Sequence, residues 1–284
     1  MKSPLSVVLP VVGFLLSSPA PVHTQCSDGG VCTLSPGQAT DFHRISADAS
    51  FGKSGGDENI TYTSFRLLPS LALFPGSRLN LVIPFSRQSG PLGGATGIGD
   101  VMLVWVQELS ADPENEVELQ GGLRLATADE NAGSLPQRYQ SGLGTNDILL
   151  GAGWVNGHWQ AGAGFQIPLG RSANSVDRLK RGPDLMLRAG YTFEHERLRI
   201  TGELIGIKRL GLSSVQDTTT TDERFVDVPG SDQTQINVVL TPSLRLSEHL
   251  SLRAAVAVPL LKREINVDGL TRAFTAVLGV EFSL

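Results

Sequence analysis

The sequence predicts an all-β fold, a closed antiparallel transmembrane β-barrel of about 12 strands. Three observations support this prediction. Apolar and polar residues alternate with a period of two from about residue 42 to the end of the chain. Past the first sixteen residues, no apolar run approaches the roughly 20 residues that a transmembrane helix needs. Short and long connections alternate between the predicted strands, as in barrels with turns at one end and loops at the other.

The C-terminus shows the alternation most clearly. One face of residues 271–284 carries Phe274, Ala276, Leu278, Val280, Phe282 and Leu284. The other face carries Thr275, Val277, Gly279, Glu281 and Ser283. Since successive side chains of a strand point to opposite faces, only the first of these two faces suits lipid.

The same pattern, followed along the whole chain, gives an even number of strands. They are expected near residues 42–54, 59–74, 78–88, 97–109, 116–128, 146–156, 158–169, 184–195, 197–210, 234–247, 250–261 and 271–284. Short turns such as Asn156-Gly157, a strong two-residue hairpin signal, alternate with long connections such as Glu130 to Thr145. The glycine-rich segment Gly93 to Gly99 is expected to be a flexible external loop, because no Lys-Ser/Thr completes a phosphate-binding motif.

The composition and charge exclude other classes of protein. The formal net charge is −5, so the basic surface of a nucleic-acid binder is missing. A soluble β-sandwich or lipocalin-like barrel is the main structural alternative, since its strands also alternate. Such a domain keeps charges out of its interior, whereas here charges of both signs lie opposite the apolar face on strand after strand. A polar interior is typical of a porin-like barrel.

Residues 1–24 are expected to be a signal peptide that is removed on export. Lys2 supplies the positive start, Leu5 to Leu16 the apolar core, and Ser18-x-Ala20 a small-residue site, although cleavage nearer Gln25 also fits. A transmembrane anchor would need a longer apolar stretch.

A short periplasmic segment, residues 25–41, is expected to follow the signal peptide and to precede a barrel of residues 42–284. It holds the only two cysteines, Cys26 and Cys32, for which a small disulfide ring is the first interpretation in an oxidising compartment. A lipidated Cys26 and free or metal-bound thiols are the alternatives.

Two sets of side chains are candidates for functional positions in the barrel. The inward-facing charges expected to line the lumen are Arg66, Glu118, Arg124, Arg188, Arg199, Glu203, Arg245 and Arg253. The outward-facing aromatics expected to form the membrane-interface girdles are Trp105, Trp154, Trp159, Phe85, Phe165 and Tyr191. A register slip of one residue would exchange the two faces of a strand.

Three glycine-led segments carry a family resemblance. They are Gly97 to Leu103 (GIGDVML), Leu119 to Thr127 (LQGGLRLAT) and Gly144 to Gly151 (GTNDILLG), and they follow the CSDGGVC start. Together they resemble bacterial outer-membrane barrels known as transporters or as meta-pathway of phenol degradation proteins. The resemblance implies passage of small, apolar or aromatic molecules, with no catalytic residues. One departure is that the chain ends in Leu284 where such barrels usually end in an aromatic residue.

The first functional hypothesis is a passive or gated conduit in the bacterial outer membrane, with no cofactor. Its expected partners are outer-membrane lipid, a small-molecule permeant and, through the C-terminal strand and Phe282, the barrel-assembly machinery. A non-conducting structural or surface-interaction barrel is the second hypothesis. A barrel hydrolase is the third, but His158, His195 and His249 fall at the predicted short turns, far from an outer-leaflet substrate, so the chain is not expected to be an enzyme.

Overall fold

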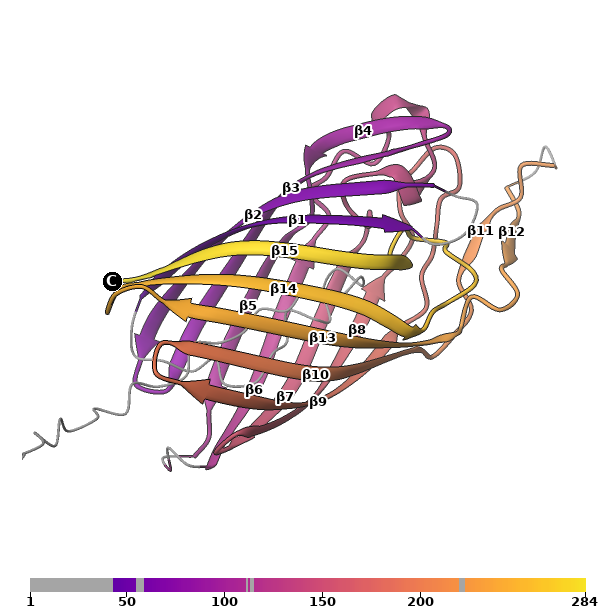
Figure 1. The fold of residues 1–284 in the computed structure, drawn as a ribbon. Helices are drawn as coiled ribbons and strands as arrows, with labels where there is room; N and C mark the ends of the chain where they lie inside the picture. Colours follow the sequence, from indigo (N-terminus) through magenta and orange to yellow (C-terminus); the bar gives the residue numbers. More distant parts are fainter. Residues whose placement is uncertain (1–42, 55–58, 111, 113–114, 220–222) are drawn as a thin grey trace, which may run out of the picture.

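The computed structural model describes residues 43–54, 59–110, 112, 115–219 and 223–284. These residues form a closed antiparallel β-barrel of 12 strands, which confirms the predicted fold class (Figure 1). The sheet closes on itself because β1 pairs with both β2 and β15, and β2 also pairs with β3. No helix in the described part of the chain is long and apolar enough to cross a membrane. The predicted signal peptide and the segment with Cys26 and Cys32 lie outside the described residues.

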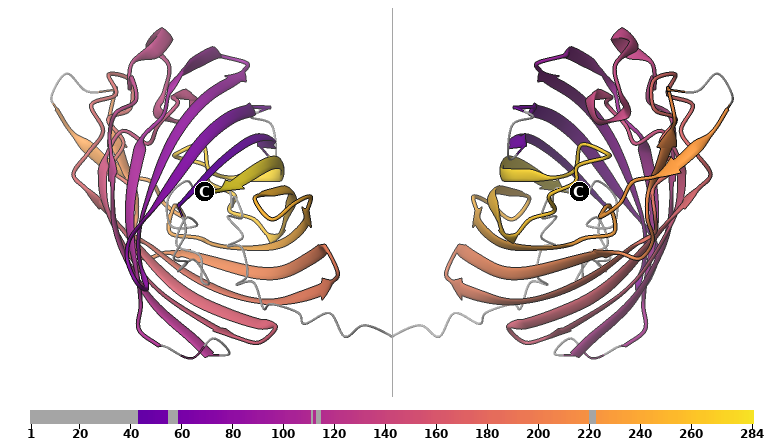
Figure 2. Two further views of the ribbon diagram at one scale, coloured as in Figure 1. Left: turned by 90° about the vertical axis from the view of Figure 1, so that its left-hand side faces the viewer. Right: turned by 90° about the vertical axis from the view of Figure 1, so that its right-hand side faces the viewer.

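Most strands begin and end within about two residues of the predicted positions. The wall consists of β1 (Arg44–Ser54), β2 (Thr61–Phe74), β3 (Ser77–Gly90), β4 (Gly93–Ile98), β5 (Val101–Glu108), β6 (Asn115–Leu125), β7 (Asn146–Asn156), β8 (Trp159–Leu169), β9 (Asp184–His195), β10 (Leu198–Arg209), β13 (Thr234–Arg245), β14 (Leu250–Leu261) and β15 (Arg272–Ser283). The strands β4 and β5 both pair with β3 and are two parts of one barrel strand. Figure 2, which views the barrel along its length, shows the strands arranged around one interior.

The two ends of the barrel differ in their connections. One end, here called the turn end, carries the C-terminus and tight turns such as those at Gly76 and Gly157, whose φ angles are 69° and 54°. The other end, the loop end, carries the long connections 126–145, 170–183, 210–233 and 262–271. In outer-membrane barrels the short turns are periplasmic and the long loops are external.

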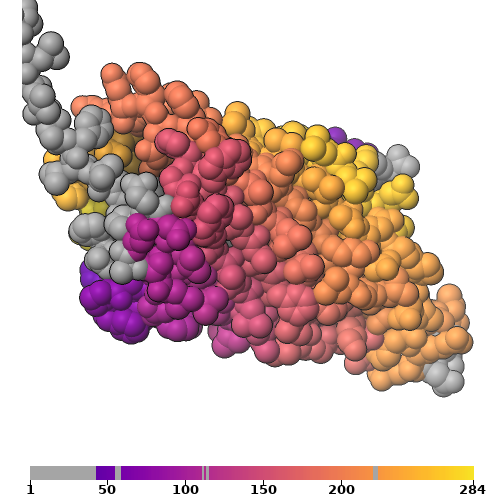
Figure 3. Space-filling view, turned by 90° about the horizontal axis from the view of Figure 1, so that it is seen from below, coloured from indigo at the N-terminus to yellow at the C-terminus, as the bar shows by residue number. Residues whose placement is uncertain are grey.

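The loop-end connections contain the remaining secondary structure. Loop 126–145 holds two short 3-10 turns, η3 (Ala132–Ser134) and η4 (Gln137–Tyr139). Loop 210–233 holds a small hairpin of β11 (Ser214–Gln216) and β12 (Phe225–Asp227). Figure 3 shows this hairpin (orange) projecting beyond the wall at the loop end.

The expectation that Gly93 to Gly99 forms a flexible loop is wrong. Residues 93–98 form β4, which pairs with the last six residues of β3, so the wall continues past the end of β6 as a hairpin. On its other side β3 pairs with β2 up to Ser89. Ala95 in this hairpin is 4% exposed, because loop 126–145 packs against it. Glycine disfavours strands through its backbone entropy, but the pairing and packing here outweigh that preference.

One ladder of the wall stops short of the loop end. Pairing between β14 and β15 ends at Ala257 and Thr275. Beyond that point β14 pairs only with β13, and the first residues of β15 pair only with β1. Figure 1 shows the ends of β14 and β15 diverging at the loop end. We call this divergence the β14–β15 seam.

Candidate functional site in the barrel interior

The interior near the turn end contains a cluster of buried ion pairs. Arg66 donates two hydrogen bonds to the carboxylate of Asp48, at 2.8 and 2.7 Å, and Arg253 lies 3.5 Å from the same carboxylate. Beside them, Arg44 lies 3.6 Å from Glu281. We call these five residues the turn-end cluster. All five belong to adjacent wall strands, so closing the barrel is sufficient to bring them together.

Glycine provides the space for this cluster. Asp48 pairs with Gly279 across β1 and β15, and Gly279 pairs in turn with Arg253 on β14. A Cβ atom at Gly279 would lie 3.1 Å from the Cβ of Asp48 and 3.4 Å from the guanidinium of Arg253. The missing side chain therefore lets Arg253 reach across β15 to Asp48.

The same arrangement occurs on the opposite wall. Glu203 on β10 forms an ion pair with Arg188 on β9 and accepts a hydrogen bond of 2.7 Å from Gln160 on β8. Gly190 lies between Glu203 and Gln160 in the register, and a Cβ there would approach Glu203 to 2.8 Å. Inward-facing glycines thus let polar or charged side chains two strands apart come into contact.

The interior near the loop end contains a second group of ion pairs. Asp147 on β7 pairs with Arg124 on β6 and, at 2.5 Å, with Arg181. Thr145 donates a 2.7 Å hydrogen bond to the same carboxylate, and Asp100 lies 3.8 Å from Arg124. Arg181 belongs to loop 170–183, so this loop enters the barrel and contributes a charge to its interior.

Loop 262–271 also contributes to this interior group. Its Asp268 lies 2.7 Å from Arg209 on β10, and its Arg263 lies 3.2 Å from Asp184 on β9. Arg209 also donates to Asp184 at 2.9 and 3.1 Å. Burial alone would raise the pKa of Asp268, but the nearby arginines, Arg209 foremost, lower it to about 2. We call these residues, with Asp100, Arg124, Asp147 and Arg181, the loop-end network.

Apolar side chains occupy much of the interior between these charges. The interior apolar cluster consists of Leu68, Val82, Met102, Val104, Val106, Leu149, Met186, Ile205, Ile207, Val239 and Ala257. Leu149 is the next inward-facing residue after Asp147, and Met186 the next after Asp184, so these two members lie directly beneath the loop-end network. Leu68 and Val106 lie farther toward the turn end. The expected polar interior extends along the wall, with buried mid-strand residues such as Asp48, Arg188 and Glu203, and the apolar cluster is a patch within it.

The eight predicted lumen residues fall into two groups in the structure. The side chains of Arg66, Glu118, Arg124, Arg188, Glu203 and Arg253 are buried on the inner side of the wall. Arg199 and Arg245 share the inward parity of their strands but lie at the turn end, where Arg199 is partly buried and Arg245 exposed. Arg199 pairs there with Glu194.

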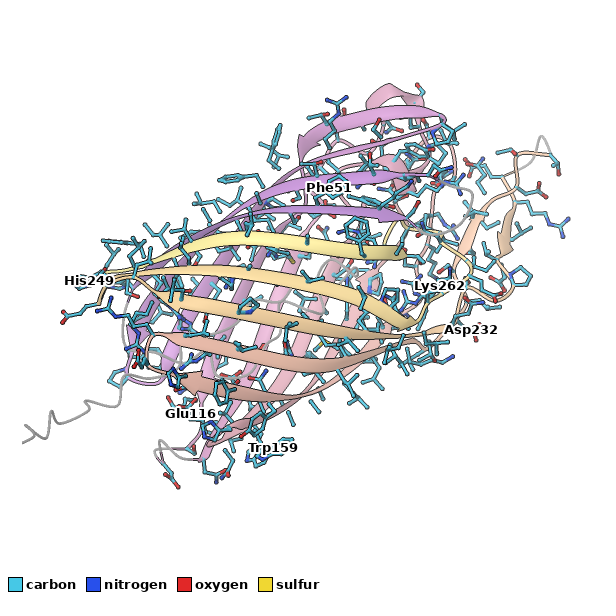
Figure 4. The ribbon with its side chains drawn as sticks, viewed as in Figure 1. Phe51, Glu116, Trp159, Asp232, His249 and Lys262 are labelled. Carbon is cyan, nitrogen blue, oxygen red and sulfur yellow. The ribbon has the colours of Figure 1, made fainter. Side chains whose placement is uncertain are left out.

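The predicted girdle aromatics lie on the outer side of the wall. Trp105, Trp154, Trp159 and Tyr191 are 40–60% exposed and lie on the turn-end parts of their strands. The rings of Trp159, labelled in Figure 4, and Tyr191 are 4.9 Å apart. Phe85 is exposed in the loop-end half of β3, and Phe165 is partly buried. Sequence reasoning missed Phe51 and Phe274, which meet at 5.8 Å near the loop end.

Most of the buried ion-pair partners are absent from the eight predicted lumen residues. Asp48 and Asp147 have the inward parity of their strands, so a search for opposite charges at paired positions would have found them. Arg181, Arg263 and Asp268 lie in loops, where no periodicity shows which side chains turn inward. Among the described residues, no group of three or more His, Cys, Asp or Glu side chains is placed to hold a metal ion.

Comparisons with known proteins add a structural likeness. No family model matches the chain, and no curated protein sequence matches it. An outer membrane channel from Pseudomonas putida F1 has a TM-score of 0.64 at 14% identity, covering 86% of this chain and 96% of that one. The NanC porin has a TM-score of 0.50 at 11% identity, covering 84% and 100%. Outer membrane phospholipase A from Escherichia coli has a TM-score of 0.43 at 13% identity, covering 88% and 91%.

The chain has the barrel fold of bacterial outer-membrane proteins. At these identities the likeness concerns the fold alone. The functional argument therefore depends on the interior described above.

Proposed function

We propose that this barrel is a gated outer-membrane conduit for small, largely apolar molecules. The observation that carries the proposal is the interior apolar cluster, which faces the inside of a membrane-type barrel beneath a network that loops help to form. A barrel of about 12 strands is wider than the roughly eight-stranded case that side chains just fill. Apolar lining favours an apolar permeant, because a polar one would lose its hydration without gaining hydrogen bonds.

The gate in this proposal is the loop part of the loop-end network. Arg263 and Asp268 hold loop 262–271 on the wall through Asp184 and Arg209. A loop can leave the lumen without breaking the ladder of the wall, since its own contacts to β9 and β10 are side-chain ion pairs. In this proposal the arrangement with both ion pairs formed is the closed state.

The test is planar-bilayer conductance and liposome uptake with the refolded protein. The double variant Arg263→Ala/Asp268→Ala should open the lumen and raise conductance several-fold over wild type. Arg178→Ala is the matched control, because Arg178 is also a loop arginine in an ion pair, with Glu223, but that pair is exposed at the surface. Unchanged conductance and uptake in the double variant would contradict the gate.

A non-conducting structural barrel is the second candidate. The observation that favours it is the density of buried ion pairs at both ends of the interior. It predicts that wild type and the double variant both remain sealed to ions and to small apolar solutes. Arg124→Glu and Arg188→Glu extend the comparison, since a conduit should change its ion selectivity with either substitution.

A further inference from the structure

The charged side chains of the wall strands are divided unequally between the two faces of the wall. Every Asp and Glu on these strands has the inward parity of its strand: Asp48, Glu108, Glu116, Glu118, Asp147, Asp184, Glu194, Glu203 and Glu281. On the described wall strands, the Lys and Arg side chains that face outward are Lys53, Arg87 and Lys208. Arg272 is not among them, because a bulge turns it inward, where its guanidinium lies 4.3 Å from the ring centroid of buried Tyr62.

The three outward-facing cations all lie at the loop end. Lys53 and Lys208 are the second-last residues of β1 and β10, and Arg87 lies near the loop end of β3. The outer face at the turn end carries aromatic side chains instead, such as Trp159 and Tyr191. In outer-membrane barrels the loop end is the external one, and basic residues at a membrane surface attract anionic headgroups. The distribution of charge therefore predicts anionic headgroups around the loop end.

Two of the three cations lie close together, on either side of β2. Lys53 pairs with Thr61 and Arg87 with Thr63, so two threonines on the outer face of β2 separate them. With strands about 4.8 Å apart and about 3.4 Å per residue, their Cα atoms are about 12 Å apart. Both side chains are exposed and long, so their charged groups can meet at one anion above Thr63.

No acidic side chain shares this part of the outer face. The outward positions of β1 to β4 and of β15 carry only apolar residues, glycine, Ser, Thr and these two cations. Lys208 on the opposite side of the barrel is in a different setting, since its Nζ donates to the backbone carbonyl of Asp232 at 2.5 Å. An anion is therefore expected beside Lys53 and Arg87 rather than beside Lys208.

Aromatic side chains lie next to the two cations on the same face. One step toward the turn end, Phe65 and Phe85 are both exposed and pair across β2 and β3. Phe51, labelled in Figure 4, and Phe274 meet at 5.8 Å beside them. Long basic side chains keep their charged ends in the polar region while apolar surface below them faces hydrocarbon. Cations and hydroxyls next to exposed aromatics thus match a lipid, with a polar headgroup and acyl chains.

We propose that the outer face of β1–β3 at the loop end binds an outer-leaflet lipid whose headgroup carries a phosphate monoester. Lys53 and Arg87 contact the phosphate, Thr63 donates a hydrogen bond to it, and acyl chains pack on Phe65 and Phe85. A guanidinium suits this partner, because it can donate two parallel hydrogen bonds to phosphate. A monoester carries up to two negative charges, so it fits two cations better than a phosphodiester does. The site lies outside the barrel and does not depend on the proposed conduit.

Three lipids test the chemical class: bisphosphorylated lipid A, lipid A freed of both phosphates, and phosphatidylglycerol, which carries one phosphodiester. Native mass spectrometry of the refolded, delipidated protein measures the bound fraction against lipid concentration. Phosphorylated lipid A should bind most tightly, phosphatidylglycerol several-fold more weakly, and the dephosphorylated lipid at least tenfold more weakly. Equal binding of lipid A with and without its phosphates would overturn the proposal, and equal binding of phosphatidylglycerol would overturn its assignment to a monoester.

An excess of inorganic phosphate tests the contribution of the acyl chains. Phosphate alone cannot use the aromatic surface, so lipid A should stay bound. Displacement of lipid A by inorganic phosphate would overturn the assignment to a lipid.

Two double variants test the location. Lys53→Gln/Arg87→Gln should lower the affinity for phosphorylated lipid A at least tenfold and leave that for the dephosphorylated lipid unchanged. Lys208→Gln/Arg224→Gln is the matched control, since it also removes two exposed cations of the loop end. The gel-shift of the folded barrel checks that both variants fold. An equal loss of affinity in the two variants would mean that binding follows net charge alone, and would overturn the site.

This experiment can fail separately from the conductance test. Lipid binding to the outer face needs no open lumen, so a sealed barrel that binds phosphorylated lipid A keeps the site and refutes the conduit. A conducting barrel that does not distinguish the two forms of lipid A keeps the conduit and refutes the site.

Discussion

The turn-end cluster and the loop-end network use the same chemistry but are built from different parts of the chain. Every member of the turn-end cluster lies on a wall strand, so its ion pairs form as the barrel closes. In the loop-end network, Arg181, Arg263 and Asp268 come from loops. The first cluster therefore links wall strands to each other, whereas the loop residues of the second can be released while the wall stays intact.

The largest expected effect is at the turn end. Asp48→Ala leaves Arg66 and Arg253 buried without their shared carboxylate, and breaking a buried pair in this way costs about 3–5 kcal/mol. Urea unfolding in lipid vesicles, followed by the gel-shift of the folded barrel, measures this loss. Asp268→Ala is the comparison variant. If both substitutions lower the stability of the barrel equally, the turn-end cluster contributes no more to the stability of the wall than the loop-end network does.

Gly279→Val should be the next most damaging substitution. The added side chain meets Asp48 at 3.1 Å and displaces Arg253, and overpacking of this kind costs about 1–3 kcal/mol. Gly202→Val is the control, since a Cβ at Gly202 would meet no atom within 4 Å. The same urea unfolding measures both variants. Equal stability of the two would show that Arg253 does not need the space above Gly279.

Acidification should act on the loop-end network with a defined sign. The pKa of Asp268 is lowered from 3.8 to about 2, so its contribution to holding loop 262–271 is complete above about pH 4 and is lost as the pH falls through 2. Conductance recorded between pH 7 and pH 2 should rise in that window. Asp268→Asn should already show raised conductance at pH 7. If this variant stays closed at pH 7, the Asp268 carboxylate does not hold the gate.

The smallest effect is expected at the turn-end rim. Arg245 is exposed, so Arg245→Ala should change the free energy of unfolding by less than about 0.5 kcal/mol. A loss comparable to that of Asp48→Ala would mean that the rim belongs to the turn-end cluster.

The strand period was sufficient to predict the barrel, because each wall strand must present one face to lipid along its whole length. The same period placed Arg66, Arg188 and Glu203 inside. It could not place Arg181 or Asp268, since loop residues follow no period and their direction depends on which wall charges they meet. The period also failed to predict the strand within Gly93 to Gly99, where pairing with β3 overrides the preference of glycine for loops.

The β14–β15 seam makes one part of the wall easier to open than the rest. Past Ala257 and Thr275, backbone amides on the facing edges of the two strands have no ladder partner across the seam. Hydrogen exchange should therefore be fastest there among the wall strands, and local unfolding should begin at these residues. Loop 262–271 connects the two strands at this point, so the proposed gate is attached to the part of the wall that opens most easily.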